Sequence, residues 1–179
     1  MAGEVTLVEG NRQAFKAATS WAPGAAATDT FTITGAPQRI IRILKIKLSG
    51  IATAAIITPV DLIRRTTANS AGTAVTVGSV CTDAKNTNPS KALVQKYTAP
   101  PTTGSVTNGG TLEIVRLPLA TTANAVPGGV YEFDFTTAGS TPITLRTELD
   151  VLAINLEGVT IAGLNLSACI EYIEEEINF

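Results

Sequence analysis

Residues 163–174 read G-L-N-L-S-A-C-I-E-Y-I-E, and this stretch decides the fold class. Its apolar and polar side chains alternate with a period of two. The apolar set is Leu164, Leu166, Ala168, Ile170 and Tyr172, and the residues between them are Asn165, Ser167, Cys169 and Glu171. Because successive side chains of a β-strand point to opposite faces, the pattern predicts one long strand with a buried face and a solvent face.

The segment upstream of this stretch shows the same two-residue period. Residues 143–151 alternate between apolar and polar types, whereas residues 151–154 and Leu156 are apolar on both faces, as in a strand that is covered on both sides. The dipeptide at 157–158, Glu-Gly, lies between the two runs and is a turn signal. We predict that residues 143–175 form a long antiparallel hairpin in the middle of a β-sandwich.

The composition agrees with an all-β protein. The 179 residues are 45% hydrophobic but only 5% aromatic, and they include 15 Gly and 9 Pro, which separate short runs rich in Thr, Val and Ile. About eight or nine strands follow one another at spacings typical of a sandwich. We therefore predict an antiparallel, jelly-roll-like β-sandwich over residues 28–179.

Several classes of function lack the residues that they need. The chain has no His, which excludes Ser-His-Asp and Cys-His catalysis and His-ligated metals. Phosphate-binding glycine motifs and C-x-x-C pairs are also absent from the sequence, and Cys81 and Cys169 are interpreted as reduced, structural residues. Two i, i+2 carboxylate pairs, in residues 132–134 and 148–150, are interpreted as solvated strand faces. We predict no enzymatic activity, no cofactor and no metal.

Charge is distributed unevenly along the chain, although the net charge is only −2. Residues 37–66 carry six basic side chains and one acidic side chain, whereas residues 132–179 carry nine acidic side chains and one basic side chain. If these regions are neighbours in the sheet, opposite charges on facing positions stabilise the pairing. The same asymmetry could instead match a basic face of one subunit to an acidic face of the next. The small net charge predicts neither a nucleic-acid nor a membrane partner.

Residues 1–27 are predicted to lie outside the sandwich as an N-terminal arm. They contain four large apolar side chains but no clear strand-length alternation: Val5, Leu7, Phe15 and Trp21. One interpretation is a frayed leader whose Trp covers the edge of the sandwich. The other is an arm that docks on a neighbouring subunit through these four residues, since aromatic side chains dominate such contacts.

Four phrases of the sequence resemble small β-sandwich structural proteins of tailed bacteriophages, including capsid decoration or cement proteins. They are T-D-T-F-T-I-T-G (28–35), V-D-L-I-R-R-T-T-A-N-S-A-G-T (60–73), V-L-A-I-N-L-E-G (151–158) and L-N-L-S-A-C-I-E-Y-I-E-E (164–175). The resemblance implies a jelly-roll fold, several copies per particle and contact with a major capsid protein. It supplies no site residues.

The expected function is therefore that of a non-enzymatic virion protein that bridges neighbouring capsid subunits. We expect a homo-oligomer, with a trimer favoured, on the capsid surface. The chain lacks a secretory signal and is expected to be made in the host cytoplasm. The alternative is a tail, fibre or head-fibre module that binds a host receptor or glycan. Glycan sites commonly expose aromatic side chains, and the long loops at 67–73, 82–91 and 99–110 have only Tyr97 nearby, which favours the capsid interpretation.

Overall fold

The computed structural model describes residues 12–106, 110–121, 129–137 and 141–177, and this part of the chain is all-β, as predicted. It contains twelve strands: β1 (Arg12–Trp21), β2 (Ala27–Thr34), β3 (Arg39–Ala52), β4 (Ile56–Arg65), β5 (Thr73–Thr76), β6 (Ser79–Cys81), β7 (Leu93–Ala99), β8 (Gly110–Thr121), β9 (Tyr131–Asp134), β10 (Ile143–Leu145), β11 (Val151–Val159) and β12 (Asn165–Glu176).

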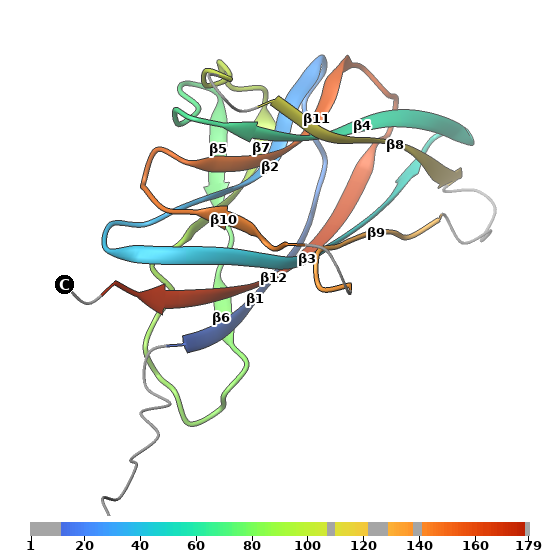
Figure 1. The fold of residues 1–179 in the computed structure, drawn as a ribbon. Coiled ribbons are helices and arrows are strands. Elements are labelled where there is room, and N and C mark those ends of the chain that lie inside the picture. Colours follow the sequence, from blue (N-terminus) through green and yellow to red (C-terminus); the bar gives the residue numbers. More distant parts are fainter. Residues whose placement is uncertain (1–11, 107–109, 122–128, 138–140, 178–179) are drawn as a thin grey trace, which may run out of the picture.

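The strands form one curled sheet in the order β5-β7-β2-β11-β4-β8-β3-β12-β1-β6, with β9 and β10 also paired to β3 (Figure 1). We call the segment from β5 to β8 the β11 half, and β3, β12, β1 and β6, with β9 and β10, the β12 half. Strand β8 joins the halves, because it pairs along β4 and its end runs parallel to Ile51 and Ala52 of β3. Among the described strands this is the one parallel contact, so the sheet is mixed rather than purely antiparallel.

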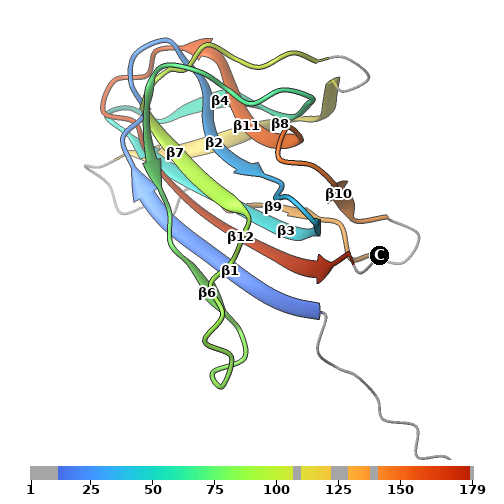
Figure 2. The same cartoon turned by 90° about the vertical axis from the view of Figure 1, so that its left-hand side faces the viewer.

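Most of the stretch at residues 163–174 lies in β12, and its predicted alternation is confirmed. Leu166, Ala168, Ile170 and Tyr172 are buried, whereas the residues between them are more exposed. Strand β12 lies between β1 and β3 and is antiparallel to both, as the lower part of Figure 2 shows. Its apolar side therefore faces the interior of the curl along its whole length.

The predicted hairpin over residues 143–175 is wrong. Its first part is β10, which pairs with β3, and β11 pairs with β2 and β4, whereas β12 belongs to the other half. The Glu157–Gly158 pair does adopt left-handed φ values of 55° and 76°, but it produces an irregularity within β11 instead of a hairpin turn. The chain reverses later, at Gly163 (φ 64°), where any Cβ would lie 2.3 Å from Thr53 Oγ1.

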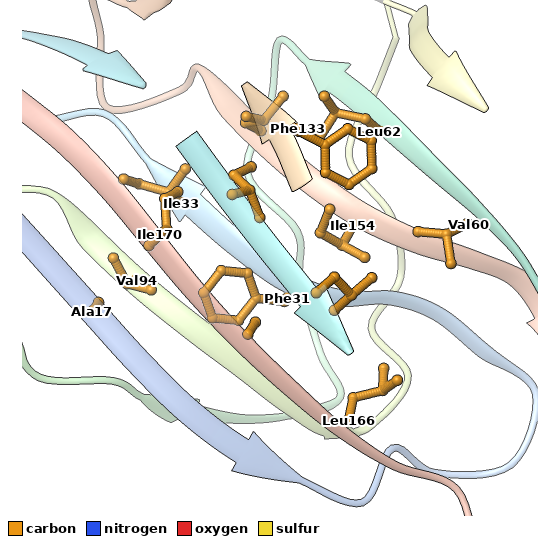
Figure 3. Packing of buried hydrophobic residues seen from close by; sticks show 14 of the residues in the cluster. Ala17, Phe31, Ile33, Val60, Leu62, Val94, Phe133, Ile154, Leu166 and Ile170 are labelled. Carbon is orange, nitrogen blue, oxygen red and sulfur yellow. The ribbon is translucent and has the colours of Figure 1, made fainter. Parts of the chain in front are cut away.

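One hydrophobic core fills the space between the halves. Residues 151–156 of β11 are all buried, which confirms that this strand is covered on both sides. Figure 3 shows side chains from both halves in a single cluster, among them Phe31, Ile33, Val60, Leu62, Val94 and Ile154 from the β11 half and Ala17, Leu166 and Ile170 from the β12 half. The core thus depends on the curl of the sheet.

The predicted arm over residues 1–27 is wrong for its described part, because residues 12–21 form β1. This strand pairs with β12 along its whole length. Phe15 stacks on Tyr172 with ring centroids 5.8 Å apart, and Trp21 stacks on Phe31 of the opposite half at 5.7 Å. Both side chains are therefore buried in this chain's own core.

Trp21 also has a polar partner in the core. Its Nε1–H donates a hydrogen bond of 3.0 Å to Thr30 Oγ1, so the ring joins β1 to β2 across the interior. The other two proposed anchors, Val5 and Leu7, lie outside the described residues.

We predict that Trp21→Ala lowers the free energy of unfolding by about 3–5 kcal/mol, because it leaves a cavity between the two halves. The matched control is Val80→Ala on β6, where the side chain is exposed and the change should stay within about 0.5 kcal/mol. Urea unfolding followed by circular dichroism measures both values. Near-equal stability of the two variants would contradict the placement of β1 in the core.

Candidate contact surface

The basic and acidic regions of the sequence form salt bridges with each other within the chain. The regions of opposite charge are neighbours in the sheet, since β3 pairs with β12 and β9. Nitrogen–oxygen distances join Arg39 to Glu176 (3.3 Å), Arg42 to Glu175 (3.0 Å), Lys45 to Glu132 (2.8 Å) and Asp134 (3.3 Å), and Lys47 to Glu132 (3.3 Å). The interpretation as facing charges is confirmed.

The predicted solvated carboxylate pair on β9 is salt-bridged. Hydrogen bonding to Lys45 lowers the pKa of Glu132, and the Thr136 hydroxyl, followed by Lys45, lowers the pKa of Asp134. In the second predicted pair, Asp150 accepts backbone hydrogen bonds from residues 146 and 147. These carboxylates therefore stabilise the pairing of strands and the conformation of a turn.

The outer face of the β11 half holds a buried ion pair. Strand β2 has an extra residue, Thr30, relative to β11, and this bulge turns Asp29 away from the core. Arg65 Nε and Nη2 donate to the two carboxylate oxygens of Asp29 at 2.5 and 2.6 Å, and both side chains are almost fully buried. The amide groups of Asn69 and Asn155 donate to the same carboxylate at 2.8 and 2.7 Å. The Asp29 charge is therefore neutralised and fully hydrogen-bonded.

The same network holds together two of the predicted long loops, those at 67–73 and 99–110. Arg65 Nη1 donates to the Gly104 carbonyl oxygen at 3.0 Å, and the Gly104 N–H donates to Asn69 Oδ1 at 2.8 Å. A Cβ at Gly104 would lie 1.9 Å from the Thr67 carbonyl oxygen, so the approach of the loops requires glycine. Tyr97, the aromatic residue considered for glycan binding, is buried beneath them, and this burial raises its pKa.

The third predicted loop is fastened by Glu174 of β12. Its carboxylate accepts hydrogen bonds from the Ser90 hydroxyl and from the backbone N–H groups of Lys91 (3.0 Å) and Ala92 (2.9 Å). Two polar hollows lie beside this loop. One of about 240 Å³ is lined by Gln13, Arg39, Asn88, Pro89, Lys91, Glu174 and Glu176. The other, of about 470 Å³, is lined by Arg12, Gln13, Asn86 and Asn88, among others.

Exposed Ile, Leu and Pro side chains lie together on the outer face of β4 and β8. The register sets Ile57 opposite Pro118, Pro59 opposite Arg116, and Asp61 opposite Ile114. Ile57 is 62% exposed and Ile114 61% exposed. We define the β4–β8 strip as Ile57, Pro59, Leu112, Ile114, Arg116 and Pro118.

An exposed apolar face of this kind commonly marks a site of protein–protein contact. It is the candidate contact surface of the described part of the molecule. The signal in the sequence was weak, because residues 56–63 and 112–119 are apolar at both parities and do not reveal which side faces solvent.

Two carboxyl groups, those of Asp61 and Glu157, lie at one end of the strip and interact with each other. Asp61 is 8% exposed, and its buried Oδ1 has no hydrogen-bond partner within the described part of the chain. Burial raises the pKa of Asp61 most, the neighbouring Glu157 raises it further, and the Arg116 charge lowers it.

Comparisons with protein-family models, with curated protein sequences and with solved structures each find no match. Within the described residues, no three His, Cys, Asp or Glu side chains gather where they could hold a metal ion. The described part also has no helix long and apolar enough to cross a lipid bilayer.

We predict that Arg65→Met destabilises the protein by about 3–5 kcal/mol, because it leaves the Asp29 charge buried and unpaired. The adjacent Arg64→Met is the matched control. Arg64 is 3.9 Å from Asp150 with a side chain 40% exposed, so its loss should change stability by less than about 1 kcal/mol. Thermal denaturation compares the two, and limited proteolysis should cut residues 99–106 faster in Arg65→Met alone. Equal behaviour of both variants would contradict the clamping role of the network.

Proposed function

We propose that this chain is a non-enzymatic structural protein of a tailed-bacteriophage virion that decorates or cements the capsid. The observation that carries the proposal is the β4–β8 strip, an apolar surface with Ile57 and Ile114 more than half exposed on a regular sheet. The resemblance of four sequence phrases to phage β-sandwich proteins supplies the class. The proposed partner is the major capsid protein, and the proposed location is the capsid surface after synthesis in the host cytoplasm.

The proposal includes a fold of the jelly-roll sandwich type. In its favour, the two halves of the curled sheet face one another across one core, and an early and a late strand, β3 and β12, are neighbours. Three of the four phrases also contain the buried network, with Asp29 in the first, Arg65 and Asn69 in the second and Asn155 in the third. These three phrases thus include residues of this chain that hold the loops on the sheet.

The strip is the favoured surface for assembly because many polar groups elsewhere on the surface are already bonded within the chain. The charged groups of β3, β9 and β12 are paired within the chain, and the loops are fastened by internal hydrogen bonds. Burial of exposed apolar area contributes about 25 cal/mol per Å², and a stable interface commonly buries about 800 Å² on each partner. We propose a closed homo-oligomer, with a trimer favoured, in which the strip contributes to the contact between copies.

The alternative function is a tail, fibre or head-fibre module that binds a receptor or glycan. The two polar hollows favour it specifically, because they share Gln13 and Asn88 and carry amide and guanidinium groups suited to hydroxylated ligands. Their described linings lack an aromatic side chain for stacking on a sugar ring. Cryo-electron microscopy of intact virions would distinguish a capsid-surface position from a tail or fibre position.

We predict that Ile57→Lys combined with Ile114→Lys abolishes self-association, because it places two charges in the apolar contact. Leu149→Lys is the matched control, since Leu149 is also exposed but lies outside the strip. Sedimentation velocity at high protein concentration should show oligomers for wild type and control and monomers for the double variant, all with similar melting temperatures. Oligomers of equal affinity in all three proteins would exclude the strip as the contact.

A further inference from the structure

Asp61 and Glu157 are brought together by the pairing of β4 with β11. Asp61 lies directly opposite Asn155, and the β4–β11 pairing ends at that position. Glu157 follows two residues later with φ 55°, in the irregular segment of β11, and its N–H donates to Asn155 Oδ1 at 2.6 Å. This turn places the exposed Glu157 side chain within hydrogen-bond reach of the buried Asp61 carboxyl group.

Neighbouring groups relieve the repulsion between these carboxylates only in part, through the nearby Arg116 charge. The Asn155 amide is used at both ends, since its Nδ2 donates to Asp29 and its Oδ1 accepts from Glu157. Ile114, opposite Asp61 on β8, is apolar. Within the described residues Asp61 forms no ion pair, and its Oδ1 is buried without a donor. A buried carboxylate in this condition requires a proton or a cation.

We propose that Asp61 and Glu157 form a binding site for a hard divalent cation, Ca²⁺ or Mg²⁺. Asp61 supplies the buried side of the site and Glu157 the solvent side, where water completes the coordination shell. Two carboxylates suffice for a weakly held ion, since Mg²⁺ is commonly bound by one or two carboxylates and water, and Ca²⁺ also accepts water ligands. The inference is independent of the proposed virion function.

Arg116 distinguishes this site from an internal ion pair. It lies opposite Pro59, diagonal to Asp61 on the same face, and it is exposed. If a cation occupies the site, the Arg116 charge repels it, and Arg116→Gln should tighten binding by about two- to fivefold. If Arg116 itself neutralises Asp61, the same variant should lower stability and leave the response to metal unchanged.

The test is a thermal melt of the full chain in CaCl₂ or MgCl₂ against NaCl of equal ionic strength at pH 7.5. With a dissociation constant of about 1 mM, 10 mM of the ion should raise the melting temperature by about 3–5 °C. Asp61→Asn and Glu157→Gln should each remove the shift. Glu148→Gln, which changes an exposed acid elsewhere, should retain it.

Isothermal titration calorimetry with each metal salt checks that the shift reports binding. The affinity should fall from pH 7.5 to pH 5.5, because protons compete for the same oxygens. The proposal is overturned if wild type shows no metal-dependent shift and is instead stabilised as the pH falls, which would indicate a shared proton only. It is also overturned if the Asp61→Asn protein responds to metal as wild type does.

Discussion

The buried ion pair of Asp29 and Arg65 is the constraint on which the β11 half of the sheet and its loops depend. A carboxylate taken out of water must be neutralised and hydrogen-bonded, and here that requires a bulge in β2, side chains from β4 and β11, and two loops. The pair is weak evidence for stability in itself, since an apolar replacement of both partners is often as stable. The pair instead fixes the position of the loops. Arg65 and Asn69 bond to the backbone of Gly104 and so hold the loops on the sheet.

Local periodicity in the sequence predicted local structure well. The alternation of β12, the double-sided burial of residues 151–156 and the pairing of basic with acidic strands are all found in the structure. The pairing of strands was predicted poorly, because it depends on contacts between residues distant in sequence. The left-handed pair at Glu157–Gly158 has the same signature whether it makes a hairpin turn or an irregularity within one strand. In β1 the buried positions include Phe15, Ala17 and Trp21, and the small Ala in an Ala-rich run hid the two-residue period.

The candidate site was not predictable in the same way. A sequence reveals that β4 and β8 are apolar, but not that Ile57 and Ile114 on these strands are exposed. The arm residues attracted attention because large aromatic side chains outside a recognised strand suggest an interface, whereas here Phe15 and Trp21 complete the core. Exposure of Ile57 and Ile114 follows from the pairing of β4 with β8, which places both side chains on the outer face.

The strip and the carboxylate pair lie on the same face, and this proximity links the two proposals. A partner seated over Ile114 would also approach Asp61, its cross-strand neighbour. Burying two adjacent carboxylates is unfavourable, whereas burying a pair neutralised by a divalent cation is far less so. By mass action, an ion that binds the assembled form more tightly than the free chain stabilises assembly by the same factor. Cation binding and self-association are then thermodynamically coupled, although either can exist without the other.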